Sequence, residues 1–219
     1  MPQYRTVALT MARRLDIHPT HPQARLLATA ADALRNGDVI IYPTDSTYAL
    51  GCAIDAKTAQ ARIHQIRGDK GLHHLTLMCR DLSELATYAR VSNSAYRLLR
   101  ALTPGPYTFI LQGSRELPKR ILDPKRKTIG LRIPDHAVAQ GLLSELQSPM
   151  LSATLLTPNA ATDEADPWAL AARFDDLVDV FIDAGHCGTE PTTIIDLSDE
   201  LPRLVRQGRG DPSRFFNLT

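Results

Sequence analysis

The sequence predicts an α/β fold, in which helices cover the faces of a sheet. Short β-branched runs alternate along most of the chain with segments of helical periodicity, and this alternation is typical of a sheet with helical connections. The chain has 219 residues, of which 43% are hydrophobic, so it can bury a substantial core. We see no internal repeat, and we expect one domain over residues 1–219.

Five segments have the periodicity of helices. In the first, Leu27, Ala31 and Leu34 recur on one helical face, and Gly37 follows as a stop signal. Asp55 is the expected N-cap of the second helix. The predicted helices span residues 23–36, 55–66, 82–89, 93–102 and 138–146.

Eight short apolar runs predict the strands. Pro43 and Pro134 directly follow two of these runs, and they fit strand ends because proline cannot donate to a ladder. A Pro-Gly-Pro turn at 104–106 precedes another run, and the acidic stretch 163–166 is expected to be a surface loop. The predicted strands span residues 39–42, 75–79, 107–111, 128–133, 150–155, 178–182, 193–197 and 203–207.

Composition excludes several classes of protein. The net charge of +1 provides no global field that would draw the chain to nucleic acid or to a membrane. No run of about 18 apolar residues could span a bilayer, and residues 1–5 lack the apolar core of a signal peptide. Cys52, Cys79 and Cys187 are odd in number and far apart, which disfavours a disulfide framework or a thiolate zinc site. We therefore expect a cytoplasmic protein without a metal site and without a membrane partner.

Two stretches are nevertheless basic. Residues 115–127 contain six basic and two acidic residues, a local charge of six minus two, or +4. Residues 203–214 contain four arginines and one aspartate, a local charge of four minus one, or +3. Together they could build one positive cleft for a polyanion such as ATP, or for local contact with RNA, because guanidinium groups match phosphate oxygens. The alternative is an ordinary solvated surface loop.

The stretch Thr44-Asp45-Ser46-Thr47 places hydroxyl groups around one carboxylate directly after a predicted strand. At the mouth of a sheet these groups can grip the ammonium and carboxylate of an amino acid, or the ribose of a nucleotide. The alternative is a local turn in which the side chains bond the backbone and cap a helix. The residues alone leave both interpretations open.

Four separated segments together resemble the signatures of the YrdC-like family, which read YPT(D/E)TVYGLG, PGPxT(F/L)xL, (V)GVR(V/I)PxH and STIVDL…(L/I)RxG. The matching segments here are residues 42–51, 103–111, 129–136 and 192–197 followed by 205–208. They lie in the family's order within a core of about residues 24–208, with short extensions at both ends. Residues 76–82 and 125–130 resemble the YciO branch of that family.

The resemblance implies a twisted, open sheet of parallel and antiparallel strands around a large basic cleft. It also implies an ATP-binding protein related to threonylcarbamoyl-AMP synthases, which join L-threonine, bicarbonate and ATP during tRNA modification. Magnesium is expected to arrive with the nucleotide, and RNA, including double-stranded RNA, is a further implied partner. No side chain needs to act as a catalytic nucleophile. The implied substrate-binding residues are Ser46, Arg132 and Thr192. The implied nucleotide-binding residues are Arg67, Lys70, Thr108, Thr154 and Arg206.

Two family signatures are altered in this chain. A Lys-x-Arg signature reads Arg67-Gly68-Asp69, so Lys70 is the nearest cation that could replace the second one. A Ser-x-Asn signature has Thr154 and Leu156 at its two polar positions. Three interpretations follow: a nucleotide- and RNA-binding relative without the synthase reaction, an active threonylcarbamoyl-AMP synthase, or an enzyme of another acyl or carbamoyl adenylate. We favour a YciO-type protein that binds a nucleotide and RNA, and the sequence leaves its synthase activity open.

Overall fold

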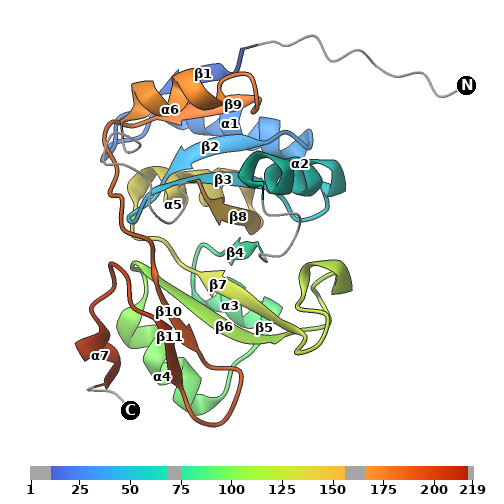
Figure 1. Cartoon of the computed structure of the whole chain (residues 1–219), viewed down its shortest axis with the longest axis vertical. Coiled ribbons are helices and arrows are strands. Elements are labelled where there is room, and N and C mark those ends of the chain that lie inside the picture. Colours follow the sequence, from blue (N-terminus) through green and yellow to red (C-terminus); the bar gives the residue numbers. More distant parts are fainter. Residues whose placement is uncertain (1–10, 69–74, 156–165, 217–219) are drawn as a thin grey trace, which may run out of the picture.

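One mixed sheet runs through the computed structural model, which describes residues 11–68, 75–155 and 166–216 (Figure 1). Within these residues the strand order is β1-β9-β2-β3-β8-β4-β7-β6-β10-β11, and β5 also pairs with β6. The bounds of the strands are β1 Arg13–Asp16, β2 Ile40–Pro43, β3 Tyr48–Ala53, β4 Thr76–Met78, β5 Ala89–Arg90, β6 Tyr107–Gly113, β7 Thr128–Arg132, β8 Met150–Thr154, β9 Val180–Asp183, β10 Thr193–Asp196 and β11 Arg203–Arg206.

Parallel and antiparallel pairs alternate irregularly along this sheet. The pairs β1–β9, β2–β9, β4–β7 and β6–β10 are parallel. The pairs β2–β3, β3–β8, β4–β8, β6–β7, β5–β6 and β10–β11 are antiparallel. The predicted α/β fold with a mixed sheet is therefore confirmed.

Helices pack on both faces of the sheet. Their bounds are α1 Ala24–Arg35, α2 Lys57–Arg67, α3 Leu82–Tyr88, α4 Asn93–Leu102, α5 Ala137–Leu146, α6 Pro167–Phe174 and α7 Pro212–Phe216, with a 3-10 turn η1 at Lys119–Ile121. No helix in the described ranges is both long enough and apolar enough to cross a membrane.

Each face of the sheet has its own apolar core, and β2 contributes to both. Ile40 and Tyr42 point into the core formed with α1 and α5. Val39 and Ile41 point into the core on the other face, to which α2, α3, α4 and α6 contribute. This alternation follows from the two-residue period of a strand.

Helices α1 and α5 approach each other closely because α5 carries a glycine at the contact. A Cβ atom placed on Gly141 would lie 2.6 Å from Cδ1 of Leu27 in α1. Leu27 is 4% exposed, so it has little space to move away. A larger side chain at position 141 would therefore require the Leu27 side chain to move.

The core under α1 and α5 ends at Met78 of β4. Beyond it, the same face of the sheet carries small or hydroxyl-bearing residues, because Thr76 pairs with Ser152 in β8 and with Gly130 in β7. A Cβ atom on Gly130 would lie 3.2 Å from Cγ2 of Thr108 and 3.3 Å from Oγ1 of Thr76. This part of the face therefore has room for a cavity.

Several sequence predictions need correction. The part of the chain that the structure describes has eleven strands where we predicted eight, because β1, β3 and β5 did not stand out in the sequence. Asp55 is not the N-cap of α2: the cap position is Ala56, and the helix begins at Lys57. Nothing contradicts the loop expected at 163–166: Asp166 lies just before α6 and caps it by accepting from Trp168 N, and residues 163–165 lie outside the described ranges.

Candidate functional site

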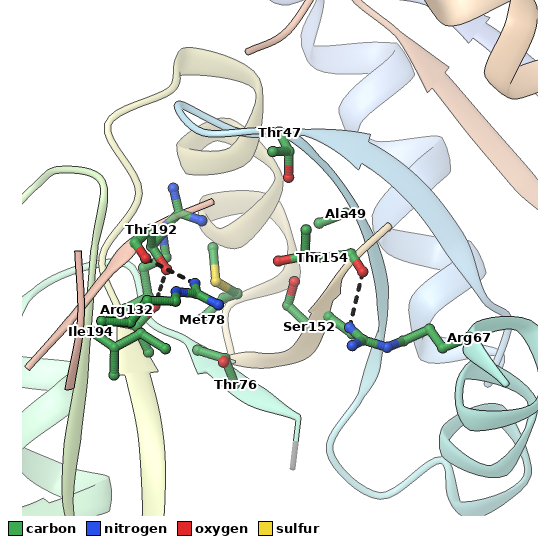
Figure 2. A pocket seen from close by; sticks show the side chains of 13 residues that line it. Thr47, Ala49, Arg67, Thr76, Met78, Arg132, Ser152, Thr154, Thr192 and Ile194 are labelled. Atoms are coloured by element: carbon green, nitrogen blue, oxygen red, sulfur yellow. Dashed lines mark hydrogen bonds between the residues drawn. The ribbon is translucent and has the colours of Figure 1, made fainter. Parts of the chain in front are cut away.

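A cavity of about 190 Å³ lies where the central strands expose polar side chains (Figure 2). Its lining comes from β3, β4, β6, β7, β8, β10 and β11 and from the end of α2. We call it the arginine cavity. Its lining residues are Thr47, Ala49, Arg67, Thr76, Met78, Thr108, Arg132, Ser152, Ala153, Thr154, Thr192, Ile194 and Arg206.

Arg67, Arg132 and Arg206 supply the charge of this cavity. They are the last residues of α2, β7 and β11 respectively. Figure 2 shows Arg67 and Arg132 on opposite sides of the cavity, and Arg67 donates to the carbonyl of Thr154 at 2.9 Å. Arg206 donates to the carbonyl of Thr192 at 2.9 Å. None of the described lining residues is Asp or Glu, so the cavity favours an anionic ligand.

Hydroxyl groups surround these cations. The Thr108 and Thr192 hydroxyls lie 2.8 Å apart, a hydrogen bond between β6 and the residue before β10. The Tyr42 hydroxyl donates to Ser152 Oγ at 2.7 Å, and burial raises the pKa of Tyr42 well above its ordinary value. Tyr42 therefore remains a donor and keeps Ser152 in place. Donors and acceptors of this kind orient a polar ligand within a charged site.

A nearly buried ion pair forms one wall of the cavity. Arg132 pairs with Asp45 and also donates to Ser46 Oγ at 3.0 Å. The side chains of Arg132 and Asp45 are only 7% and 10% exposed. Ser46 is buried behind Arg132 and does not line the cavity.

The turn at 44–47 holds Asp45 and Ser46 in this position. It connects β2 to β3, whose antiparallel register pairs Pro43 with Tyr48. Thr44 Oγ1 accepts from the backbone N–H groups of Ser46 and Thr47 at 3.2 and 3.3 Å and donates to the Thr47 carbonyl at 2.7 Å. The local turn that we considered from the sequence is therefore present, at the tip of a hairpin rather than at the start of a helix.

A second pocket, of about 390 Å³, lies next to the same turn. Its lining includes Asp45, so Asp45 faces this pocket while its partner Arg132 faces the arginine cavity. Its lining residues are Thr44, Asp45, Pro106, Asp135, His136, His186, Cys187, Gly188 and Arg209.

The structure brings six of the eight implied site residues together in the arginine cavity, namely Arg67, Thr108, Arg132, Thr154, Thr192 and Arg206. Ser46 supports Arg132 from behind. Lys70, Asp69 and Leu156 lie outside the described residues.

The two basic stretches contribute little to the arginine cavity itself. No residue of 115–127 lines it, and Arg126 is bonded to Asp196 and Ser198 at 2.9 and 2.6 Å. Arg126 does line an adjoining pocket, which shares Thr76, Thr108 and Ile194 with the arginine cavity. From the second stretch, only Arg206 lines the cavity. The positive charge of the site comes mainly from element ends that are not part of a basic run.

Thr47, Thr76 and Ser152 line the cavity but were not among the implied site residues. The signal that could have found Thr76 and Ser152 is the strand period of two: Ser152 lies two residues before Thr154, and Thr76 two before Met78. The period of two shows which residues share one side of a strand. It shows that β8 and β4 line the same cavity only after the register between them is known.

The residues that the structure describes do not form a resident metal site. No group of three or more His, Cys, Asp or Glu side chains that could hold a metal ion occurs among the described residues. Mg²⁺ prefers carboxylate and phosphate oxygens, and the described lining of the arginine cavity has no carboxylate. Any magnesium there would be held by the phosphates of a ligand.

Comparison with known proteins gives one consistent family. The family described as Sua5_yciO_yrdC, Telomere recombination, matches residues 32–208. The chain is 50% identical to YciO of Escherichia coli over 206 residues, which is 94% of this chain and 100% of that protein. It is 32% identical over 192 residues to a threonylcarbamoyl-AMP synthase of Chromobacterium violaceum, covering 86% of this chain and 96% of that protein. The resemblance drawn from the motifs is confirmed.

Solved structures agree with this result. The crystal structure of Escherichia coli YciO matches with a TM-score of 0.89 and covers 94% of this chain and 100% of that one. The structure of P. abyssi Sua5 complexed with L-threonine matches with a TM-score of 0.83 at 22% identity, and the match covers 95% of this chain and 61% of that one. At 22% identity, the match to P. abyssi Sua5 shows a similar fold and nothing more specific.

Proposed function

The chain belongs to the Sua5/YciO/YrdC family, and we propose that it binds a nucleoside triphosphate, ATP in the first place, in the arginine cavity. The observation that carries this proposal is the convergence of Arg67, Arg132 and Arg206 on one cavity whose described lining has no carboxylate. Guanidinium groups bind phosphate oxygens with two parallel hydrogen bonds. Three of them around one cavity suit a polyphosphate better than a singly charged ligand.

The hydroxyl groups would complete the nucleotide site. Thr108 and Thr192 already bond each other at 2.8 Å, so each keeps further hydrogen-bonding capacity for a phosphate or ribose oxygen. Thr154 presents its side chain to the cavity while its carbonyl accepts from Arg67. Magnesium would enter on the phosphates and neutralise part of their charge.

A small amino acid is the second ligand that we propose. The supporting facts are the likeness of the fold to Sua5 complexed with L-threonine and the 32% identity to a threonylcarbamoyl-AMP synthase. Arg132 borders the phosphate site and is tied to the turn at 44–47, so it lies at the junction between the two ligands.

The full threonylcarbamoyl-AMP synthase reaction is a second candidate, favoured by the identity to the Chromobacterium violaceum enzyme over 96% of its length. In that reaction an oxygen of carboxylated threonine attacks the α-phosphorus of ATP, the bond to the β-phosphate oxygen breaks, and diphosphate leaves with the electron pair. The cavity arginines would stabilise the charge that develops on the phosphates, and positioning would supply the rest of the rate. Asp69 and Leu156 replace polar groups of the family signature, which counts against this candidate.

The proposal is tested by ATP binding to three arginine variants. Replacing Arg67 or Arg206 with Met should weaken ATP binding by about tenfold or more, because a hydrogen bond to a charged group contributes roughly 1.5–3 kcal/mol. The matched control is Arg97→Met, since Arg97 is exposed on α4 and does not line the cavity. Isothermal titration calorimetry gives the dissociation constants. Equal affinities in all three variants and the wild type would overturn the proposal.

Two further assays separate the three interpretations of function. Diphosphate release from ATP that depends on both L-threonine and bicarbonate would identify the synthase. Release that depends on another acid would identify a different adenylate-forming enzyme. Binding of double-stranded RNA that weakens steeply with salt, without diphosphate release, would identify the RNA-binding relative.

A further inference from the structure

Strand β1 lies at one edge of the sheet and leaves backbone groups unpaired there. Among the described residues, β1 pairs with β9 on one side, and no strand pairs with it on the other. The N–H groups of Arg13 and Ile17 donate to carbonyl groups on the β9 side. Successive residues of a strand direct their N–H and C=O groups to opposite sides, so those of Arg14 and Asp16 point away from β9. This edge can therefore bond a further strand.

The side chain of Asp16 has an unfavourable neighbour within the sheet. The parallel register places Asp16 directly opposite Asp183 of β9, and like charges in neighbouring positions of a sheet repel each other. Arg14 compensates part of this charge, because it pairs with Asp183 and lies 3.5 Å from Asp16. The Asp16 side chain is 84% exposed. A strand on the outer side of β1 could therefore bring a cation next to Asp16.

The charges of β1 complement those of a second copy of the same strand. In an antiparallel pair centred on Leu15, Arg14 of each copy lies opposite Asp16 of the other. Opposite charges at such positions stabilise a strand pair. The outward N–H and C=O groups belong to the same two residues, so each Arg14–Asp16 pair can exchange two backbone hydrogen bonds. On the other face, Leu15 lies opposite its own copy, and Arg13 lies opposite Ile17.

The opposite edge of the sheet does not have this property. Figure 1 shows β1 at the top of the molecule and β11 in its lower half. Arg203 and Arg206 are the charged residues of β11, so pairing with a second copy would bring cations together. Charged edge strands normally prevent pairing in this way. β1 differs because its two signs are placed so that antiparallel pairing joins opposite charges.

Large exposed side chains border β1. Trp168 of α6 is the one tryptophan of the chain, it is 71% exposed, and the Arg14 guanidinium lies 4.1 Å from the centre of its ring. Met11, two residues before β1, is 75% exposed. Tryptophan, methionine and arginine are enriched in protein–protein interfaces. The composition of this edge therefore suits a protein partner better than a small ligand.

We infer that this chain forms a symmetric dimer in which the β1 strands of two copies pair antiparallel around Leu15. The sheet then continues from one copy into the other, and the interface contains the same residues on both sides. The inference goes beyond the proposed function, because no residue of β1 is part of the described lining of the arginine cavity. The seam is short, so we expect a dissociation constant on the order of 10–100 µM.

Sedimentation velocity of the full chain, over concentrations on both sides of that value, tests the dimer. Asp16→Lys places cations opposite each other and should raise the dissociation constant about tenfold or more. Asp16→Pro removes an outward N–H group and should abolish the dimer. Proline is tolerated in edge strands where the N–H group faces solvent, so the monomer should keep its fold. The matched control is Glu200→Lys, which makes the same change of charge between β10 and β11 and should leave the dimer unchanged.

Amide hydrogen exchange, followed by NMR, tests the register. The N–H groups of Arg14 and Asp16 should exchange more slowly, by about tenfold or more, above the dissociation constant than well below it, because the dimer buries them. Those of Arg13 and Ile17 bond toward β9 in both states, so their exchange should change little. In the Asp16→Pro variant, exchange at Arg14 should not depend on concentration.

A chain that stays monomeric throughout the concentration range would overturn the inference and would leave this edge free for a strand of another protein. A dimer that neither Asp16 variant weakens would also overturn it, because the contact would then lie elsewhere. So would equal exchange rates of the Arg14 amide in monomer and dimer. Both Asp16 variants should bind ATP like the wild type, so the dimer and the proposed function can fail independently.

Discussion

Asp45 and Arg132 form an ion pair that is almost completely removed from water. Its two remaining polar atoms, Asp45 Oδ2 and Arg132 Nε, have no hydrogen-bond partner within the described chain. Breaking such a pair is costly because it leaves one buried charge uncompensated, whereas removing both charges is often nearly neutral. The presence of the pair is therefore weak evidence that it adds net stability.

Replacing one member of this pair should destabilise the protein more than replacing both. Arg132→Met should lower the free energy of unfolding by about 3–5 kcal/mol, because it leaves Asp45 buried and charged. The double variant Arg132→Met with Asp45→Asn should recover most of that loss. Urea unfolding of the four proteins in the double-mutant cycle measures both effects. A double variant less stable than Arg132→Met would contradict this explanation.

His136 predicts part of the pH dependence of stability. Burial lowers its pKa, and the charge of Arg132 lowers it further. The carboxylates of Asp45 and Asp135 raise it, but by less than burial lowers it. An unfolded histidine has a pKa of about 6.5, so below that pH the unfolded state binds a proton that native His136 resists. Above pH 6.5, His136 therefore leaves the free energy of unfolding unchanged by pH. Below pH 6.5, the free energy of unfolding falls as the pH decreases.

The His136→Gln variant measures this contribution. Between pH 7.5 and pH 5.5, the wild type should lose more stability than the variant, because glutamine does not titrate. Urea midpoints at the two pH values give the comparison, and groups other than His136 cancel between the two proteins. Equal losses of stability in the wild type and the His136→Gln variant would mean that His136 is protonated as easily in the native state as in the unfolded state.

The sequence could predict the arginines of the cavity but not the contact of Ser46 with Arg132. Arg132 and Arg206 end two strands inside recognisable motifs, and both line the cavity. Ser46 belongs to the same kind of motif, yet it bonds Arg132 from behind. Whether a turn residue faces the ligand or supports a neighbour depends on the turn geometry set by Thr44, which composition does not reveal.

At the scale of elements, β3 was missed although it pairs across the middle of the sheet. Its residues Tyr48–Ala53 are buried on both faces up to Cys52, so they lack the polar alternation that marks a half-buried strand. Gly51 lies within it, and a Cβ atom there would be 3.1 Å from Cε1 of Tyr42. A strand that is buried on both sides resembles an irregular apolar segment until its neighbours are known.

The contact between α1 and α5 predicts a sharp intolerance at Gly141. Gly141→Val should destabilise the protein by about 1–3 kcal/mol, because the buried Leu27 side chain must leave its position to make room for the valine. The control is Ala172→Val on the exposed side of α6, which should cost roughly 0.5 kcal/mol through helix propensity alone. Thermal and urea unfolding measure both. Equal costs would mean that α1 can shift away from α5.

At the scale of the whole molecule, the arginine cavity joins segments that are distant in sequence and in the sheet. Thr47 and Ala49 belong to the β2–β3 hairpin and its turn, whereas Thr192 and Arg206 belong to the β10–β11 hairpin near the other end of the strand order. Figure 1 shows these hairpins in the upper and lower halves of the molecule. The order of the motifs predicted a common site, but only the sheet register determines which side chains share it.

A ligand in this cavity should therefore stabilise both halves of the sheet together. At an ATP concentration 100 times its dissociation constant, the free energy of unfolding should rise by about 2.7 kcal/mol, because ATP binds only the native state. Amide hydrogen exchange should slow in the β2–β3 turn and also in β10 and β11, since both contribute to the lining. At the same ATP concentration, a tenfold weaker affinity in Arg206→Met should reduce the stabilisation to about 1.4 kcal/mol and should weaken the protection at both places. Protection confined to one hairpin would place the nucleotide on that half of the sheet alone and would contradict a site formed by the convergence of the three arginines.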